Sequence, residues 1–106
     1  MAALMLYPKP APRGKRSRDP VRPELRIEVL TRDGGCVAGL MGEPDCRGRL
    51  TLDHVKDQPR MGRRAPSDAQ HLVSLCEHHH YGGWATSHRY ELRVYLRNWR
   101  EYLRNL

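Results

Sequence analysis

The sequence predicts a small α+β domain that is held together by a zinc ion, with flanking helices and a disordered basic N-terminal arm. Three observations predict it. Cysteines and histidines occur at spacings that suit four zinc ligands. A short alternating apolar segment indicates a strand, and two segments with helical apolar spacing indicate helices. Because the chain has 106 residues, of which 39% are hydrophobic, its core alone is expected to be marginal without a metal.

The elements follow from local sequence signals. In chain order we expect a helix over residues 23–32, a loop over 37–45, a strand over 49–55, a long surface loop over 56–68 and a helix over 87–106. Pro23 suits the first helical turn, and Gly34 and Gly35 end that helix. Ser87 is expected to cap the last helix. Residues 68–75 form an apolar patch without an assigned element.

The last helix carries an apolar stripe at i, i+3, i+4 and i+7 spacing. Its members are Leu92, Tyr95, Leu96, Trp99, Tyr102, Leu103 and Leu106. We expect the stripe to pack against the core, and a partner surface around Trp99 and Tyr102 is the alternative. Four arginines lie away from the stripe: Arg93, Arg97, Arg100 and Arg104.

The termini and hydropathy set the expected location. Residues 1–21 combine prolines with a basic run that cannot bury itself, so we expect a flexible arm, and residues 22–106 form one domain. The arm either follows a phosphate backbone or remains a solvated tail. Residues 1–6 are too short for a signal peptide, and no apolar run approaches the roughly 20 residues of a membrane span. We therefore expect a cytoplasmic protein with no membrane partner.

Four residues form the candidate structural zinc site. Cys76 and His79 are separated by two residues, which lets both side chains reach one ion. Cys36 and Cys46 form the second pair, although their loop is longer than that of a usual zinc knuckle. Three cysteines cannot all pair as disulfides, which argues against a secreted disulfide scaffold. The alternative is that one or more of the cysteines is simply buried.

The charge indicates an acidic partner. The formal net charge is +7 and the pI is about 9.8, and most of the basic residues are arginines. Arginine binds phosphate with two parallel hydrogen bonds and stays charged at neutral pH. Nucleic acid is the commonest acidic polymer that such a surface binds. Solubility alone is the alternative explanation of the charge.

A further set of residues has a recognisable order. Asp53 and His54 end the expected strand, His71 precedes Leu72-Val73-Ser74-Leu75, and Cys76-Glu77-His78-His79-His80 follows. This order resembles that of the HNH endonucleases of the ββα-metal superfamily, and most of all the small HNH proteins of bacteriophage and bacterial genomes. The resemblance covers residues 26–80, about half of the chain.

The resemblance implies a metal-dependent endonuclease that hydrolyses DNA phosphodiester bonds and leaves 5′-phosphate and 3′-hydroxyl ends. It implies that His54 is the general base, and that Asp53 and His80 hold a catalytic Mg²⁺ or Mn²⁺, with Ni²⁺ or Co²⁺ as further supporting ions. His71 stands where the family usually has asparagine, and it orients His54, binds the metal or does neither. His88 is a rival to His80 for the metal.

The geometry of the expected strand sets a condition on this site. Adjacent residues on a regular strand point to opposite faces. Asp53 and His54 can therefore share one site only if the strand ends or twists there. His78 is expected to take no part in either metal site.

DNA contacts are expected from arginines beside the site. They are Arg47, Arg49, Arg60, Arg63 and Arg64. Such contacts bind the phosphate backbone, so we expect low sequence specificity. A monomer would nick one strand of the DNA, and a double-strand cut would need a dimer or two encounters. Phage packaging or restriction proteins are candidate partners. Two other hypotheses remain: a non-catalytic zinc-stabilised nucleic-acid-binding module, and a zinc-bound structural protein of a virion.

Overall fold

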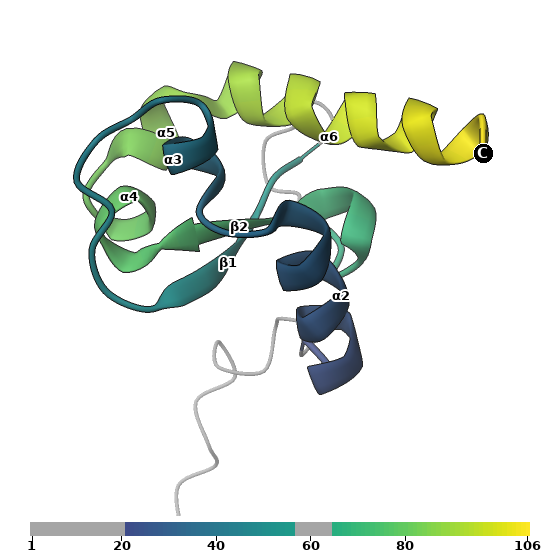
Figure 1. The fold of residues 1–106 in the computed structure, drawn as a ribbon, viewed down its shortest axis with the longest axis horizontal. Helices are drawn as coiled ribbons and strands as arrows, with labels where there is room; N and C mark the ends of the chain where they lie inside the picture. The colour runs from purple at the N-terminus through teal and green to yellow at the C-terminus, as the bar shows by residue number, and fades with distance from the viewer. Residues whose placement is uncertain (1–20, 57–64) are drawn as a thin grey trace, which may run out of the picture.

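The computed structural model describes residues 21–56 and 65–106. Within them, a two-stranded antiparallel sheet is surrounded by short helices, and one longer helix ends the chain (Figure 1). The elements in chain order are α2 (Pro23–Asp33), α3 (Val37–Leu40), β1 (Leu50–His54), the 3₁₀ helix η2 (Ala69–His71), β2 (Leu72–Cys76), α4 (Glu77–Tyr81), α5 (Trp84–Ser87) and α6 (Arg89–Arg104). This is the small α+β architecture that the sequence predicts. The predicted N-terminal arm and the middle of the predicted surface loop lie outside the described residues.

The predicted first helix and the predicted strand are confirmed. Pro23 occupies the first turn of α2, where its missing N–H costs nothing. Gly34 ends the helix at φ 72°, and its N–H donates to the Leu30 carbonyl at 2.9 Å. β1 pairs with β2 so that Asp53 lies opposite Val73 and His54 opposite Leu72. The pairing places the end of β1 beside the start of β2.

Three local assignments differ from the sequence prediction. Residues 37–40 of the expected loop form α3, because Val37 and Ala38 are buried in the core. The apolar patch before Cys76 is β2, whose five residues are all buried, so it shows no alternation from which a strand could be recognised. The last helix is interrupted, since α5 ends at Ser87 and α6 begins at Arg89. The Ser87 hydroxyl donates to the Gly83 carbonyl at 3.2 Å, so the predicted cap is wrong.

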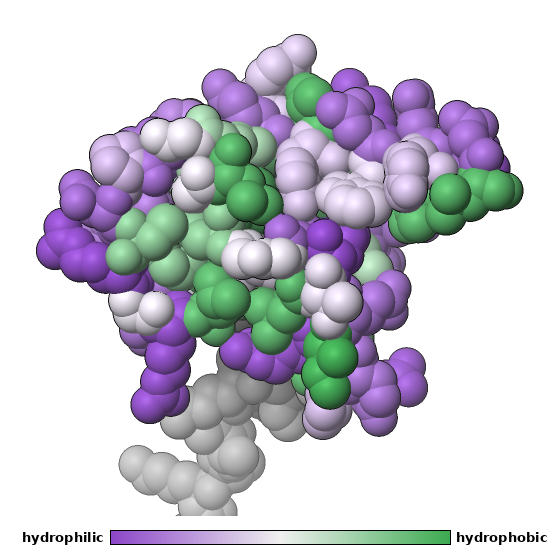
Figure 2. Space-filling view, in the orientation of Figure 1, coloured by the Kyte–Doolittle hydropathy of each residue, from purple (hydrophilic) through white to green (hydrophobic). Residues whose placement is uncertain are grey.

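The apolar stripe of α6 packs against the core only at its beginning. Leu92 and Leu96 are buried, whereas Tyr102, Leu103 and Leu106 are 57%, 54% and 83% exposed. Figure 1 shows the reason, because the second half of α6 extends past the sheet and the other helices. Figure 2 shows hydrophobic residues at this free end of the helix. The expectation that the whole stripe is core was therefore wrong for Tyr102, Leu103 and Leu106.

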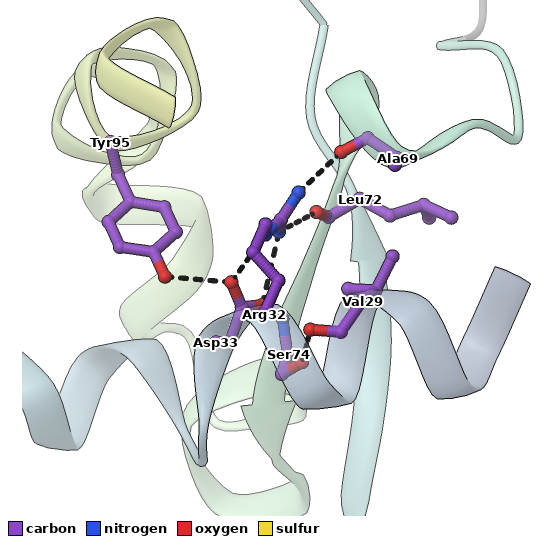
Figure 3. Close-up of polar contacts among 7 residues, drawn as sticks. All are labelled: Val29, Arg32, Asp33, Ala69, Leu72, Ser74 and Tyr95. Carbon is purple, nitrogen blue, oxygen red and sulfur yellow. Dashed lines mark hydrogen bonds and ion pairs between the residues drawn. The ribbon is translucent and has the colours of Figure 1, made fainter. Parts of the chain in front are cut away.

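A buried carboxylate joins three elements of the fold (Figure 3). Arg32 donates to both oxygens of Asp33, at 2.8 and 3.1 Å, and also to two carbonyls near the start of β2. The Ser74 N–H donates to Asp33 at 2.8 Å, and the Tyr95 hydroxyl donates to it at 2.7 Å. Burial, followed by this hydrogen bond, raises the pKa of Tyr95 to about 12. The network fixes α2 and α6 to β2.

Among the helices that the structure describes, none combines the length and the apolar character that a membrane crossing requires.

Candidate metal centre and histidine site

Four ligand atoms of the predicted zinc residues come together. Cys36, Cys46, Cys76 and His79 offer three sulfurs and one nitrogen that all lie within 4.8 Å of one another. His79 Nδ1 is 3.6 Å from the sulfur of Cys36, 3.8 Å from that of Cys46 and 3.2 Å from that of Cys76. A tetrahedral zinc ion with Zn–S near 2.3 Å and Zn–N near 2.0 Å would separate sulfur from nitrogen by about 3.6 Å. The cluster could therefore hold a structural metal such as zinc.

The backbone brings these ligands together at helix starts. Cys36 precedes α3, and Cys76 is the N-cap of α4, where its sulfur accepts the His79 N–H at 3.4 Å. Gly39 permits the approach of the intervening loop, since a Cβ at this position would lie 2.8 Å from the Cys46 sulfur. The long Cys36-to-Cys46 spacing is thus accommodated by α3 and the turn that follows it.

The hydrogen bonds and thiol acidities of the cluster suit a metal ligand set. His79 Nε2 lies 2.9 Å from the Pro44 carbonyl, which can only accept, so Nε2 carries the proton and Nδ1 faces the sulfurs. Burial acts to raise the pKa of Cys76, but hydrogen bonds from the backbone of His79 and Arg47 outweigh it and lower the value to about 7. Desolvation, followed by the neighbouring Cys36 thiol, raises the pKa of Cys46 to about 11. A divalent cation among the sulfurs would favour the thiolate form of all three.

A second cluster lies where β1 meets α4. Asp53 is buried at 6% exposure, and its Oδ1 is 3.4 Å from His80 Nε2. The Thr51 hydroxyl donates to the Leu75 carbonyl at 2.8 Å and lies 2.7 Å from His80 Nδ1. Because the hydroxyl has one proton and gives it to the carbonyl, it accepts from His80 Nδ1–H. In the neutral ring, the lone pair of Nε2 is then directed to the carboxylate side.

Arg89 completes this cluster from the start of α6. Its Nη1 donates to Asp53 Oδ2 at 2.5 Å and to the His54 carbonyl at 3.4 Å. The remaining Asp53 oxygen faces His80. The separation of 3.4 Å between Asp53 and His80 is longer than a good hydrogen bond. It is close to the roughly 3.0–3.4 Å between neighbouring ligands of an octahedral or tetrahedral ion.

The predicted base His54 and its companion His71 each have polar contacts of their own. His54 Nε2 is 3.0 Å from the Ser67 hydroxyl. His71 Nδ1 is 2.7 Å from Asp68 Oδ1, and its carbonyl accepts the Val55 N–H at 2.7 Å. His71 therefore fixes the chain directly after His54 through its backbone. β1 ends at His54, so the alternation of side chains along the strand does not continue past this residue.

The two remaining histidines, His88 and His78, have contacts outside the Asp53–His80 pair. His88 Nδ1 donates to the Trp84 carbonyl at 2.7 Å, and its ring stacks on Trp84 at 4.3 Å between centroids. His78 is exposed and borders the ring of His79. Of the three consecutive histidines, His79 thus joins the cysteines and His80 joins Asp53.

Two of the five predicted DNA-contact arginines can be placed. Arg47 and Arg49 are exposed, and their carbonyls accept the N–H groups of His78 and Glu77 at the start of α4. Gly48 between them has φ 84°, and a Cβ there would collide with Glu77. The other three, Arg60, Arg63 and Arg64, lie outside the described residues.

Sequence reasoning missed three residues of the site: Thr51, Ser67 and Arg89. Thr51 carried a usable signal, because it stands two residues before Asp53 and so shares its strand face. Ser67 and Arg89 carried none, since their contacts depend on how distant segments fold together.

Comparison with protein-family models, with curated proteins and with solved structures finds no match to this chain. What the structure defines is a small α+β protein with a Cys₃His cluster that could hold a structural metal. Any more specific interpretation rests on the chain's own residues.

Proposed function

We propose that this protein is a metal-dependent endonuclease of the HNH type that hydrolyses DNA phosphodiester bonds. The observation that carries the proposal is the Asp53–His80 pair, in which Thr51 holds His80 with Nε2 facing the carboxylate. The order of two antiparallel strands followed by a helix agrees with the ββα arrangement that the sequence resemblance implies.

The Cys₃His cluster supports this role indirectly. His79 and His80 are consecutive residues of α4. A structural ion held by His79 would therefore fix the helix that presents His80. Rigid placement of a ligand matters because sites that are loose by about 1 Å lose much of their catalytic power.

Each residue has a role in the proposed hydrolysis. Asp53 and His80 would hold a divalent cation, which supplies stabilisation of the negative charge on the phosphate and the leaving 3′ oxygen. His54 accepts the proton of the attacking water, and Ser67 positions the imidazole through the contact at Nε2. Arg89 forms an ion pair with Asp53. When Asp53 binds the cation, Arg89 would bind a phosphate oxygen of the DNA instead.

The test is cleavage of supercoiled plasmid by the purified full chain with Mg²⁺, Mn²⁺, Ni²⁺ or EDTA. We expect nicked or linear DNA only with a divalent ion. His54→Ala should lower the rate about 10²- to 10⁴-fold, the usual contribution of a general base. His80→Ala should abolish the metal-dependent cleavage. His78→Ala, which changes an exposed neighbour, is the matched control and should cleave normally. Equal cleavage by His54→Ala and wild type would overturn the assignment of the base.

A second function has two observations in its favour. Arg89 already pairs with Asp53, and His54 already contacts Ser67. These contacts also suit a non-catalytic, zinc-stabilised nucleic-acid-binding module, in which the same residues serve as scaffold. Retardation of DNA at low salt without cleavage by any metal would establish this alternative.

A further inference from the structure

The arginines of α6 form one line along the helix. Successive residues of an α-helix advance by about 100°, so the five positions fall within a sector of about 80°. They are Arg89, Arg93, Arg97, Arg100 and Arg104. The line, called here the arginine track, extends over roughly 22 Å at 1.5 Å per residue. Around the helix axis, the track is adjacent to the apolar stripe, so it runs along one side of that stripe.

The track begins at the candidate catalytic carboxylate. Arg89, its first member, donates to Asp53. The other four arginines follow on the same side of α6, away from the core contacts that Leu92 and Leu96 make. Because the second half of α6 extends past the sheet (Figure 1), the track leads outward from the site along this half of the helix. Figure 2 shows hydrophilic residues along one side of this free half.

The charge of the track is not balanced within the helix. Consecutive arginines stand three or four residues apart, and like charges at these spacings destabilise an isolated helix. α6 contains two acidic residues, Glu91 and Glu101, against five arginines. Arg89 forms an ion pair with Asp53, which lies outside the helix. Such a row is stabilised when a polyanion lies against it.

We infer that the arginine track of α6 is a binding surface for the phosphate backbone of double-stranded DNA, which it guides toward Asp53 and His80. This inference rests on the proposed function, because it takes DNA as the substrate. Double-stranded DNA carries a negative charge for about every 1.7 Å of its axis, so a row of roughly 22 Å faces several phosphates. Arginine suits this contact because its planar group binds phosphate through two hydrogen bonds.

The test is the salt dependence of DNA binding by the zinc-loaded full chain, without catalytic metal. Fluorescence anisotropy with a 24-base-pair duplex compares wild type with Arg93→Gln/Arg97→Gln/Arg104→Gln. Glutamine has nearly the helix propensity of arginine, and circular dichroism checks the fold. Each lost phosphate contact makes the slope of log K against log[salt] shallower by about 0.9, so the triple variant should lose about 2.7 units. Affinity at 0.15 M salt should fall on the order of 100-fold.

Two controls separate the track from general charge. The triple variant with lysine at the same positions keeps the charge and should keep most of the slope. Arg22→Gln removes an exposed arginine that precedes α2 and should leave the slope unchanged.

The outcomes distinguish this inference from the proposed function. Equal slopes for wild type and the glutamine variant would overturn the track, even if wild type cleaves plasmid. A slope difference without cleavage by any metal would support the track and reject the nuclease. Absence of DNA binding by wild type would reject both. If the glutamine variant loses the binding of wild type to phosphatidylserine vesicles but binds DNA as wild type does, the inference is also overturned. The track would then be assigned to an anionic membrane surface.

Discussion

Replacement of His79 by alanine tests whether the Cys₃His cluster holds the fold together. Among the described residues, the core contains eight buried valines and leucines and two alanines besides its two cysteines. A structural zinc ion contributes about 10–16 kcal/mol of apparent binding free energy at neutral pH. Whole domains are stable by only about 5–15 kcal/mol. Loss of the metal is therefore expected to remove most or all of the free energy of unfolding.

The assay combines metal content with unfolding. Wild type purified with zinc should contain one zinc ion per chain and melt cooperatively by circular dichroism. Chelation by EDTA should abolish or greatly lower the transition. Trp84, whose ring centroid is 5.9 Å from that of His79, should report the same loss by fluorescence. His79→Ala should bind zinc weakly and should resemble the chelated wild type.

The matched control is His78→Ala. His78 is exposed and precedes His79 on α4, so this variant has the same change in composition without loss of a ligand. It should keep one zinc ion and the melting temperature of wild type. A metal-free wild type that melts at the same temperature as the zinc-loaded protein would refute the reasoning, because the core would then suffice.

Three further predictions concern single contacts. Tyr95→Phe should cost about 1–2 kcal/mol by removing the hydroxyl from the buried Asp33 carboxylate. The pKa of Tyr95 is raised to about 12 in the folded protein, against about 10 in the unfolded chain. Wild type should therefore lose stability between pH 10 and 12 relative to Tyr95→Phe, as measured by chemical denaturation. Parallel curves of stability against pH for the two proteins would contradict this. Gly39→Ala should weaken zinc affinity by about 1–3 kcal/mol, because the added methyl group overpacks against Cys46. Chelator competition measures this affinity, and an unchanged value would show that the loop adjusts. Thr51→Val should reduce affinity for the catalytic cation about 10- to 100-fold through loss of the His80 contact. Thr51→Ser keeps the hydroxyl and should retain the affinity of wild type. If cleavage by the two variants depends on metal concentration in the same way, Thr51 does not have this role.

The sequence by itself determined the parts that depend on local chemistry. The Cys76–His79 pair follows from ligand spacing along one short turn, and the structure places it with Cys36 and Cys46 as expected. The α2 helix begins and ends where proline and glycine predict it. Such features are readable because the physical cause lies within a few residues of its effect.

Only the tertiary structure decided which side chains meet across the fold. Asp53, His80 and Arg89 lie on three elements, and their contacts depend on the register of β1 against β2 and on where α6 begins. The apolar pattern of α6 was visible in the sequence, but periodicity cannot show how far the core extends beneath a helix. The core ends after Leu96. Beyond it, Tyr102, Leu103 and Leu106 are exposed, because the extent of the core is set by long-range packing rather than by local propensity.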